Sequence, residues 1–196
     1  MKLIVGIGST WSLRVWLCAQ IANVAIELDV VDLTDDAQLA WLKDNSPAGL
    51  VPVLDTGAIV IHDSLAIAEY LNEVASGALY PQQQEARAMA RSLCAEMHSG
   101  FTQLRSTCPF TFAAVPPLDN LTPALGRELA RVEAIFSAAT LPFMFDAAGA
   151  VDAFYAVLAY RLKHYGVVFE GDAGKYQQSL LDWPLMQQAE LVAKGW

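Results

Sequence analysis

Cysteines, basic residues and long apolar runs are scarce in this sequence of 196 residues. The three cysteines (Cys18, Cys94 and Cys108) are an odd number without Cys-x-x-Cys spacing, so neither a disulfide framework nor a metal site is predicted. Lysine and arginine together number 12, against 21 acidic residues, and the net charge is −9. That balance argues against a nucleic-acid-binding or anionic-membrane-binding surface.

No apolar run reaches the roughly 18–20 residues of a membrane span, because Asp146, Asp152 and Arg161 interrupt the most apolar stretch. We therefore expect a cytoplasmic protein. Hydrophobic residues nevertheless make up 55% of the chain, and charged residues make up 17%, against about 25% in an average protein. This composition allows an apolar subunit interface.

The first 76 or so residues alternate between strand and helix patterns. Strands are predicted at residues 3–7, 26–30, 51–54 and 58–61, and helices at residues 12–24, 34–43 and 63–71. Between the last two strands, Asp55-Thr56-Gly57 is a hairpin signal. The order βαβαββα predicts an α/β domain over residues 1–77.

Strand patterns stop after Tyr80-Pro81. Helical patterns follow at residues 84–105, 123–139, 150–165 and 184–193. An uncharged, proline-containing stretch at residues 106–118 is predicted to be a packed loop. The sequence therefore predicts an all-α domain over residues 85–196, joined to the first domain by a linker at about residues 78–84.

Three hydroxyl residues, Ser9, Thr10 and Ser12, lie where the first predicted strand passes into the first predicted helix. Unpaired backbone N–H groups and the positive end of the helix dipole favour an anion there, such as a thiolate or a phosphate. The simpler interpretation is that one of these hydroxyls only caps the helix.

Two further pairs of residues point to a bound ligand. Val51-Pro52 begins a predicted strand, and a cis bond there would turn the Val51 backbone toward an extended peptide ligand. Asp63-Ser64 lies at a strand-to-helix junction, where an acid and a hydroxyl can bind an amino group and a carboxylate together. Taken alone, an edge-strand proline and a helix cap explain these pairs equally well.

In order and spacing, the motifs Ser-x-x-Ser-x-Arg, Ser-Pro-Ala-Gly-x-Val-Pro-x-Leu and Asp-Ser-x-Ala-Ile-x-x-Tyr-Leu resemble those of the glutathione S-transferase superfamily. Residues 95–101, with Leu104-Arg105 and Pro109, are similar to a mostly uncharacterised, bacterial, serine-type subfamily. Asp152 matches the buried capping-box aspartate of the superfamily. The resemblance covers nearly the whole chain and implies a thioredoxin-like N-terminal domain followed by an all-helical bundle.

The resemblance also implies an activity: glutathione, as co-substrate, is activated as a thiolate that attacks a small hydrophobic electrophile, usually in a homodimer and without a metal. Ser9 takes the position of the serine that hydrogen-bonds the sulfur, with Thr10 and Ser12 as alternatives. The Val51 backbone would pair with the cysteinyl part, with Pro52 cis. Asp63 and Ser64 would bind the γ-glutamyl end.

Departures from the superfamily pattern occur at two positions. Leu50 stands where relatives often have Lys, Gln or Arg near the glycine end of glutathione, and the candidates to compensate are Lys43 and Trp41 on the second predicted helix. Gly149 replaces the usual capping-box Ser or Thr, and it remains a tolerable N-cap for the helix that contains Asp152.

The electrophile site is expected between the two domains. The residues predicted to line it are Trp11, His98, Ser99, Arg105, Phe110 and Phe112. A lone histidine such as His98 more often has a structural role than a catalytic one.

Two other motifs suggest different functions. Asp55-Thr56-Gly57 matches an aspartic protease turn, but the helical second half of the chain argues against a protease. Gly6-x-Gly8 begins a dinucleotide-binding fingerprint, but Trp11 stands at the position of its third glycine. A non-catalytic ligand-binding protein of the same fold, or a glutathione-dependent isomerase or ether-cleaving enzyme, remains open. A glutathionyl-cysteine reductase is disfavoured because no cysteine stands at Ser9.

Overall fold

The structure is a computed structural model that describes all residues 1–196. The chain divides into two compact units. The first unit is formed by Met1–Leu79 together with Gln188–Trp196, and the second by Tyr80–Gln187. No helix combines the length and the apolar character that crossing a bilayer requires.

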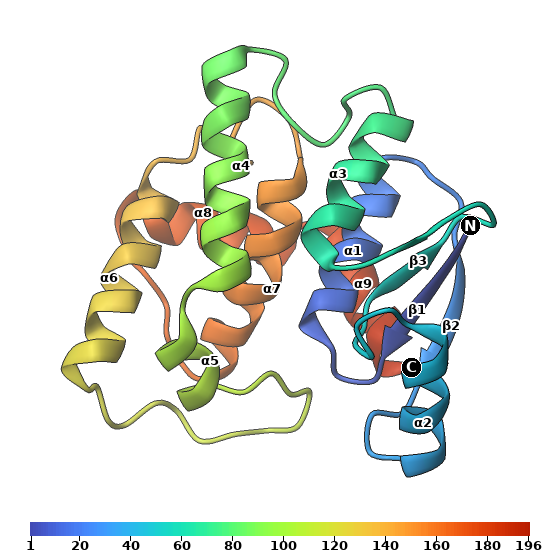
Figure 1. Cartoon of the computed structure of the whole chain (residues 1–196). Helices are drawn as coiled ribbons and strands as arrows, with labels where there is room; N and C mark the ends of the chain where they lie inside the picture. Colours follow the sequence, from blue (N-terminus) through green and yellow to red (C-terminus); the bar gives the residue numbers. More distant parts are fainter. The chain divides into compact units, whose positions relative to one another are not determined.

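The first unit contains a four-stranded sheet in the order β2-β1-β3-β4 (Figure 1). Its strands are β1 (Lys2–Gly6), β2 (Glu27–Val31), β3 (Val53–Asp55) and β4 (Val60–Ile61). Its helices are α1 (Thr10–Ile21), α2 (Asp36–Asn45) and α3 (Ser64–Val74). Strand β1 pairs with β2 in parallel and with β3 antiparallel. The predicted βαβαββα order and thioredoxin-like fold are confirmed.

Strand β1 has buried side chains on both faces of the sheet. Leu3 and Val5 are fully buried, and Ile4, whose side chain points to the opposite side of the sheet, is 5% exposed. Ile4 belongs to a core cluster with Val31, Leu42 and Val53, and Leu42 lies on α2. Helices α1 and α3 pack against each other. Both faces of β1 are therefore buried, as the continuous apolar run predicts.

The β3–β4 hairpin explains the protease-like sequence Asp55-Thr56-Gly57. The Thr56 amide donates to the Ile59 carbonyl at 3.0 Å, and the Asp55 carboxylate accepts a 2.7 Å hydrogen bond from the Gly57 amide. The Asp55 side chain therefore closes a turn. Because β3 runs antiparallel to β1, the sheet also lacks the parallel continuation of a dinucleotide-binding fold.

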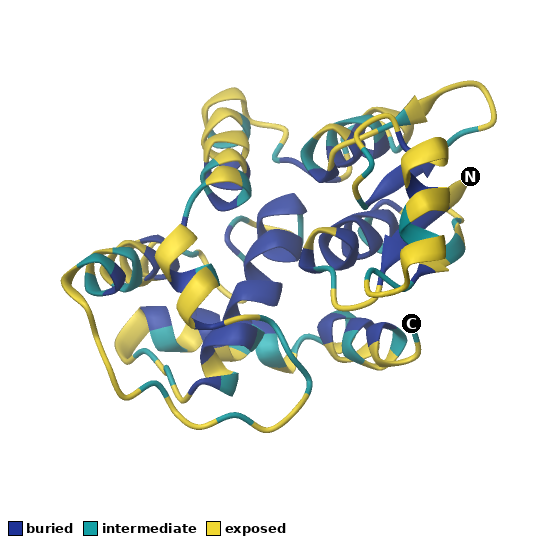
Figure 2. Cartoon of the chain, turned by 60° about the horizontal axis from the view of Figure 1, so that its bottom comes forward, coloured by how far each residue is buried: buried dark blue, intermediate teal, exposed yellow.

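The second unit is helical. It contains α4 (Gln84–Ser99), α5 (Thr102–Thr107), α6 (Pro123–Ser137), α7 (Ala150–His164) and α8 (Gly171–Asp182). Helix α7 packs against α4 and α8, and α6 packs against α5 and α8. Almost every residue of α7 is buried, and this helix is dark blue over most of its length in Figure 2. The loop spans residues 108–122, whereas residues 106–118 were predicted, because Ser106 and Thr107 belong to α5.

Three expectations about the helical part are corrected. The predicted helix at residues 84–105 is two helices, because Phe101 adopts a left-handed conformation with φ of 58°. Helix α8 was not predicted, since its buried face contains Gln177, a polar residue that the apolar pattern misses. Helix α9 (Pro184–Lys194) starts in the second unit, but residues from Gln188 onward belong to the first. Amphipathic spacing predicts that a helix such as α9 forms. It does not show which hydrophobic core the buried side of that helix joins.

Asp152 joins the start of α7 to neighbouring parts of the second unit. Its carboxylate is 1% exposed and accepts hydrogen bonds from the Met144 amide (2.8 Å), the Gly149 amide (2.9 Å) and the Tyr176 hydroxyl (2.7 Å). Gly149 is the N-cap residue, as predicted. Burial raises the pKa of the Asp152 carboxyl, and the hydrogen bonds from Met144, Tyr176 and Gly149 oppose that rise. One side chain thus satisfies three donors from three segments.

Replacing Asp152 with alanine should destabilise the fold by about 3–5 kcal/mol, because three donors lose their acceptor. Urea unfolding followed by circular dichroism measures the change. Asp172→Ala is the matched control, since this exposed carboxylate pairs only with Lys175 at the surface and its loss should leave the unfolding midpoint unchanged. Equal midpoints for the two variants would contradict the assignment.

Candidate glutathione site

The turn between β1 and α1 is closed by hydrogen bonds between the turn residues. Ser9 is the N-cap of α1, and its hydroxyl oxygen accepts a 3.2 Å hydrogen bond from the Ser12 amide. The Ser9 amide donates to the Gly6 carbonyl at 2.9 Å. The Ser12 hydroxyl oxygen in turn accepts a 3.2 Å hydrogen bond from the Gly6 amide. Both Ser9 and Ser12 therefore have structural roles in this turn.

Exposure distinguishes the three candidate hydroxyls. Thr10 is 2% exposed and Ser12 is completely buried, whereas Ser9 is half-buried. The Ser9 oxygen accepts one hydrogen bond, and its O–H donates none within the protein. Of the three hydroxyls, that of Ser9 is therefore the one that an external sulfur atom can reach.

Val51 lies beside this turn. The Val51–Pro52 bond is cis, as expected, and no backbone hydrogen bond involves Val51. A methyl group built on Gly6 would lie 2.8 Å from a Val51 methyl carbon, so Val51 contacts the strand end that holds Ser9. Pro52 is buried and directly precedes β3. The unpaired N–H and C=O of Val51 can accept an extended peptide as an additional strand.

Asp63 and Ser64 are located at the start of α3. The Asp63 carboxylate is the N-cap, accepting hydrogen bonds from the amides of Leu65 (2.9 Å) and Ala66 (3.3 Å). Asp63 is exposed, whereas Ser64 is completely buried. Asp63 therefore offers a negative charge at the surface, whereas the Ser64 hydroxyl lies inside the protein.

Comparisons with known proteins agree with this geometry. Residues 8–74 match the family described as "Glutathione S-transferase, N-terminal domain". A glutathione transferase homologue from Burkholderia, solved with bound glutathione, is 22% identical, with 100% of this chain and 98% of that chain covered and a TM-score of 0.73. Glutathione transferase F2 from Populus trichocarpa is 18% identical, with 100% and 99% covered and a TM-score of 0.78.

The first unit thus matches the N-terminal domain family of glutathione S-transferases, and the whole chain shares the fold of glutathione transferase structures.

Among relatives described by an activity, two are isomerases. The probable maleylacetoacetate isomerase of Caenorhabditis elegans is 35% identical over 99 residues, which is 50% of this chain and 46% of that protein. The chain thus matches about half the length of this curated relative. A bacterial, zeta-class maleyl pyruvate isomerase structure is 21% identical, with 96% of each chain covered and a TM-score of 0.72.

Arg14 is a feature of this glutathione S-transferase-like site whose burial the sequence did not predict. Its side chain is 1% exposed, and its guanidinium carbon lies 5.7 Å from the centre of the Trp11 ring. The charge of Arg14 acts to lower the pKa of Cys18 within the same helix. A buried cation in α1 adds to the positive potential at the N-terminus of this helix. The Ser-x-x-Ser-x-Arg motif was the only signal that marked it.

The surface next to Val51 is apolar where superfamily relatives are often polar. Leu50 is 68% exposed and Trp41 is 40% exposed. The Ser46 hydroxyl group bridges the Leu50 amide and carbonyl, which holds the turn between α2 and Val51. Lys43 is exposed on α2, and its Cγ lies 3.4 Å from a methyl group built on Gly49. Lys43 therefore reaches this turn from the preceding helix.

The residues predicted to line the electrophile site are divided between the units. Trp11 is 37% exposed and belongs to the first unit, whereas His98 and Arg105 belong to the second. The Arg105 guanidinium donates to the carbonyls of Gly100 (3.0 Å), His98 (3.3 Å) and Met97 at the end of α4. Burial lowers the pKa of Arg105, and Glu128 opposes that change. Arg105 thus stabilises a helix C-terminus.

Phe110 and Phe112 pack within the second unit. Their rings lie 5.2 Å apart and contact the Tyr160 ring on α7 at 5.7 and 6.1 Å. The Tyr165 hydroxyl donates to the Pro109 carbonyl at 2.9 Å. These contacts attach the loop at residues 108–122 to the end of α7. Ser99, also predicted for this site, is exposed on α4, and its hydroxyl donates to the Ala95 carbonyl at 3.0 Å.

Cysteine chemistry has no support in the structure. Cys18, Cys94 and Cys108 are all buried and free. Burial raises the pKa of Cys18 to about 12, although the nearby Arg14 charge acts in the opposite direction. Burial also raises the pKa of Cys108. No cluster of three or more His, Cys, Asp or Glu side chains is arranged to bind a metal ion.

We expect the three thiols to resist alkylation in the folded protein at mildly alkaline pH and to react fully in strong denaturant. Mass spectrometry after iodoacetamide treatment counts the modified sites. Because the folded pKa of Cys18 is about 12, above the ~8.5 of an unfolded thiol, stability should fall as the pH rises through that interval. Modification of native Cys18 as fast as of the unfolded chain would contradict this picture.

Proposed function

We propose that this chain is an enzyme that binds glutathione on its first unit and activates the thiol as a thiolate for attack on a small hydrophobic electrophile. The observation that carries the proposal is the unpaired backbone of Val51, whose side chain packs against Gly6 at the start of the turn that contains the half-buried Ser9. An extended peptide that pairs with Val51 would bring a cysteinyl sulfur toward the N-terminus of α1.

A hydroxyl donor and a helix N-terminus both stabilise a thiolate, and they therefore lower the pKa of a bound thiol. A free thiol with a pKa near ~8.5 is mostly protonated at neutral pH. Each pKa unit of lowering corresponds to about 1.4 kcal/mol of preference for the thiolate. The Ser9 O–H, the amides of the first turn of α1 and the buried Arg14 cation together can supply one or two such units. Catalysis then requires only that an electrophile be held over the sulfur.

The first unit attracts an anionic ligand through local donors. Residues 1–80 contain 10 acidic and 3 basic residues, so long-range attraction does not recruit glutathione, itself an anion. The Val51 backbone and the start of α1 would bind the cysteinyl part. The exposed Asp63 carboxylate would pair with the γ-glutamyl ammonium group, whereas the buried Ser64 hydroxyl is not proposed to contact the ligand. We therefore expect modest glutathione affinity.

The remaining parts of the proposal come from the superfamily. Trp11 is the proposed contact of the electrophile on the first unit, and the active form is proposed to be a homodimer. Exposed apolar side chains such as Ile59, Val60 and Val74, which are 55%, 45% and 46% exposed, are consistent with a subunit interface.

Ser9→Ala should lower kcat/KM for conjugation of an aryl halide about tenfold or more at neutral pH, because the bound thiol returns toward its free pKa. The ultraviolet absorbance of the bound thiolate should decrease in parallel. Thr122→Ala is the matched control, since the Thr122 hydroxyl oxygen caps α6 with an equivalent 3.2 Å hydrogen bond and lies outside the proposed site. Unchanged activity and thiolate absorbance in Ser9→Ala would refute the assigned role.

Ser12→Ala should behave differently from Ser9→Ala. It leaves the buried Gly6 amide without its acceptor, and we expect a loss of about 1–2 kcal/mol in unfolding free energy. Thermal unfolding measures this loss, and the thiolate absorbance, which the folded Ser12→Ala variant should retain, distinguishes it from Ser9→Ala. A stable Ser12→Ala variant that has lost thiolate absorbance would identify Ser12 as the sulfur partner instead.

The two isomerase relatives favour a second candidate reaction at the same site. The glutathione thiolate would add to one carbon of a cis double bond conjugated to a carbonyl, forming a C–S bond and an enolate. Rotation about the resulting single bond, followed by expulsion of the thiolate, restores the double bond in the trans form. Glutathione is regenerated and nothing is oxidised or reduced.

Consumption of thiol separates these activities. Conjugation of an aryl halide should consume one glutathione per product, whereas isomerisation of a maleyl diketone should leave the thiol concentration constant. Thiol titration together with substrate absorbance measures both, with Ser9→Ala as the control for each. Retention on immobilised glutathione without either turnover would instead establish a non-catalytic ligand-binding protein.

A further inference from the structure

A pocket in the second unit lies apart from every residue of the proposed glutathione site. It has a volume of about 380 Å³ and is formed where α4, α5 and α6 meet. The side chains that matter for its chemistry are Glu96, Phe101, Gln103, Arg127, Glu128 and Arg131. The volume falls at the lower end of the ~300–1,000 Å³ range of small-molecule pockets.

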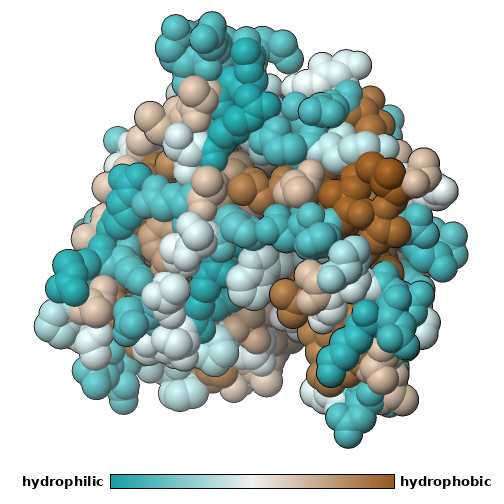
Figure 3. Space-filling model, viewed as in Figure 1, coloured by the Kyte–Doolittle hydropathy of each residue, from teal (hydrophilic) through white to brown (hydrophobic).

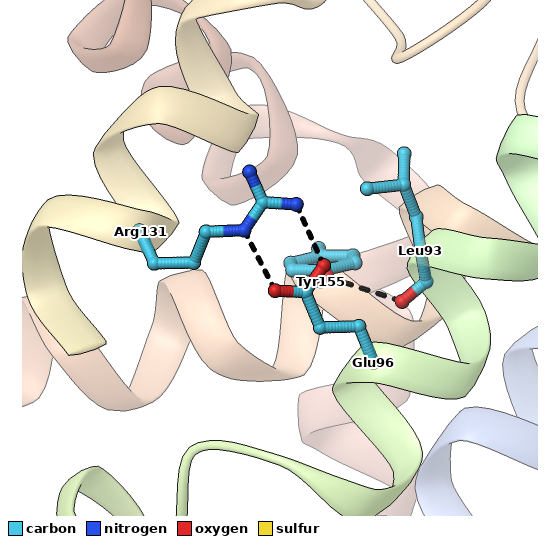
Figure 4. A network of polar contacts seen from close by, with 4 residues as sticks. All are labelled: Leu93, Glu96, Arg131 and Tyr155. Atoms are coloured by element: carbon cyan, nitrogen blue, oxygen red, sulfur yellow. Dashed lines mark hydrogen bonds and ion pairs between the residues drawn. The ribbon is translucent and has the colours of Figure 1, made fainter.

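Both carboxylates of this pocket already have partners. Glu96 pairs with Arg131 through two hydrogen bonds, of 2.7 Å to Nε and 2.8 Å to Nη2. Figure 4 shows the two side chains meeting from α4 and α6. The Glu128 oxygens accept hydrogen bonds from the amides of Gln103 (3.2 Å) and Leu104 (2.7 Å). Each of the four carboxylate oxygens in the pocket therefore already accepts one hydrogen bond from the protein.

The donors of the pocket are less occupied than its acceptors. The Arg127 guanidinium makes no hydrogen bond or ion pair within the protein, and Arg127 is exposed. Arg131 uses Nε and Nη2 for Glu96, which leaves Nη1 for a ligand. The two arginines are four residues apart on α6 and thus lie on one side of that helix.

A buried hydrogen bond joins α4, the helix that carries Glu96, to α7. The Tyr155 hydroxyl of α7 donates to the Leu93 carbonyl of α4 at 3.1 Å (Figure 4). The pocket also has apolar surface, from Phe101, which is 5% exposed, and from Ala124. Hydrophilic and apolar residues are accordingly mixed over this side of the unit in Figure 3.

We propose that this pocket binds a small organic carboxylate. The carboxylate pairs with the Arg127 guanidinium and the free Nη1 of Arg131, because a planar fork of N–H donors matches two carboxylate oxygens. The apolar body of the ligand lies against Phe101 and Ala124. The Gln103 side chain amide, which has no partner in the protein, supplies a further polar contact at the rim. This binding is independent of glutathione.

Nuclear magnetic resonance titration of the nitrogen-15-labelled full chain with benzoate, in the absence of glutathione, tests the proposal. Benzylamine and benzyl alcohol are the matched probes, since they keep the ring and replace the carboxylate with a cation or a neutral group. Benzoate should shift the amide signals of Gln103 and Arg127, and the two other probes should bind at least about tenfold more weakly.

Arg127→Gln should weaken benzoate binding about tenfold or more, because a charged hydrogen-bonded pair is lost. Lys163→Gln is the control, since it removes one positive charge from an exposed residue of α7 outside the pocket and should change the affinity less than about twofold. Equal effects of the two variants would overturn the Arg127 assignment. Shifts elsewhere in the chain, tighter binding of benzylamine, or no benzoate binding would overturn the proposal.

Discussion

Gly6 has no room for a side chain, and the geometry of the first unit's site follows from that. A methyl group at this position would lie 2.8 Å from both Leu33 and Val51. The Gly6 amide donates to the Ser12 hydroxyl oxygen, and the Gly6 carbonyl accepts from the Ser9 amide. The strand end is thereby joined to the N-terminus of α1, and the side chains of Leu33 and Val51 fill the space beside it. A larger residue at Gly6 would displace these side chains.

The second unit is organised by polar side chains that complete the ends of helices. Asp152 accepts from the N-cap residue of α7 and from two other segments. Arg105 donates to the last carbonyls of α4, and Glu128 accepts from the first amides of α5. These residues satisfy backbone groups that would otherwise lack partners in a unit without a sheet. Glu128 also lines the pocket near Arg127, so the carboxylate that binds the start of α5 forms part of the pocket wall.

In both units, the proposed ligand is bound by nearby hydrogen-bond donors and not by the net charge of the chain. The chain is acidic overall, yet each proposed ligand is an anion. In the first unit the donors are a backbone amide, a hydroxyl and the start of α1, and in the second they are guanidinium groups whose neighbouring carboxylates already have partners. Hydrogen bonds within a few ångströms therefore decide binding, since solvent and salt screen the more distant charges.

The sequence was sufficient for the βαβαββα order, the hairpin at Asp55-Thr56-Gly57 and the Gly149 helix start, because periodicity and turn chemistry are local properties. It indicated Ser9 as the sulfur partner and left Thr10 and Ser12 as alternatives, and the different burial of these three residues appears only in the folded unit. The break at Phe101, helix α8 with its buried Gln177, and the membership of residues 188–196 in the first unit depend on contacts between distant segments. Local patterns contain no record of such contacts, so packing alone settled them.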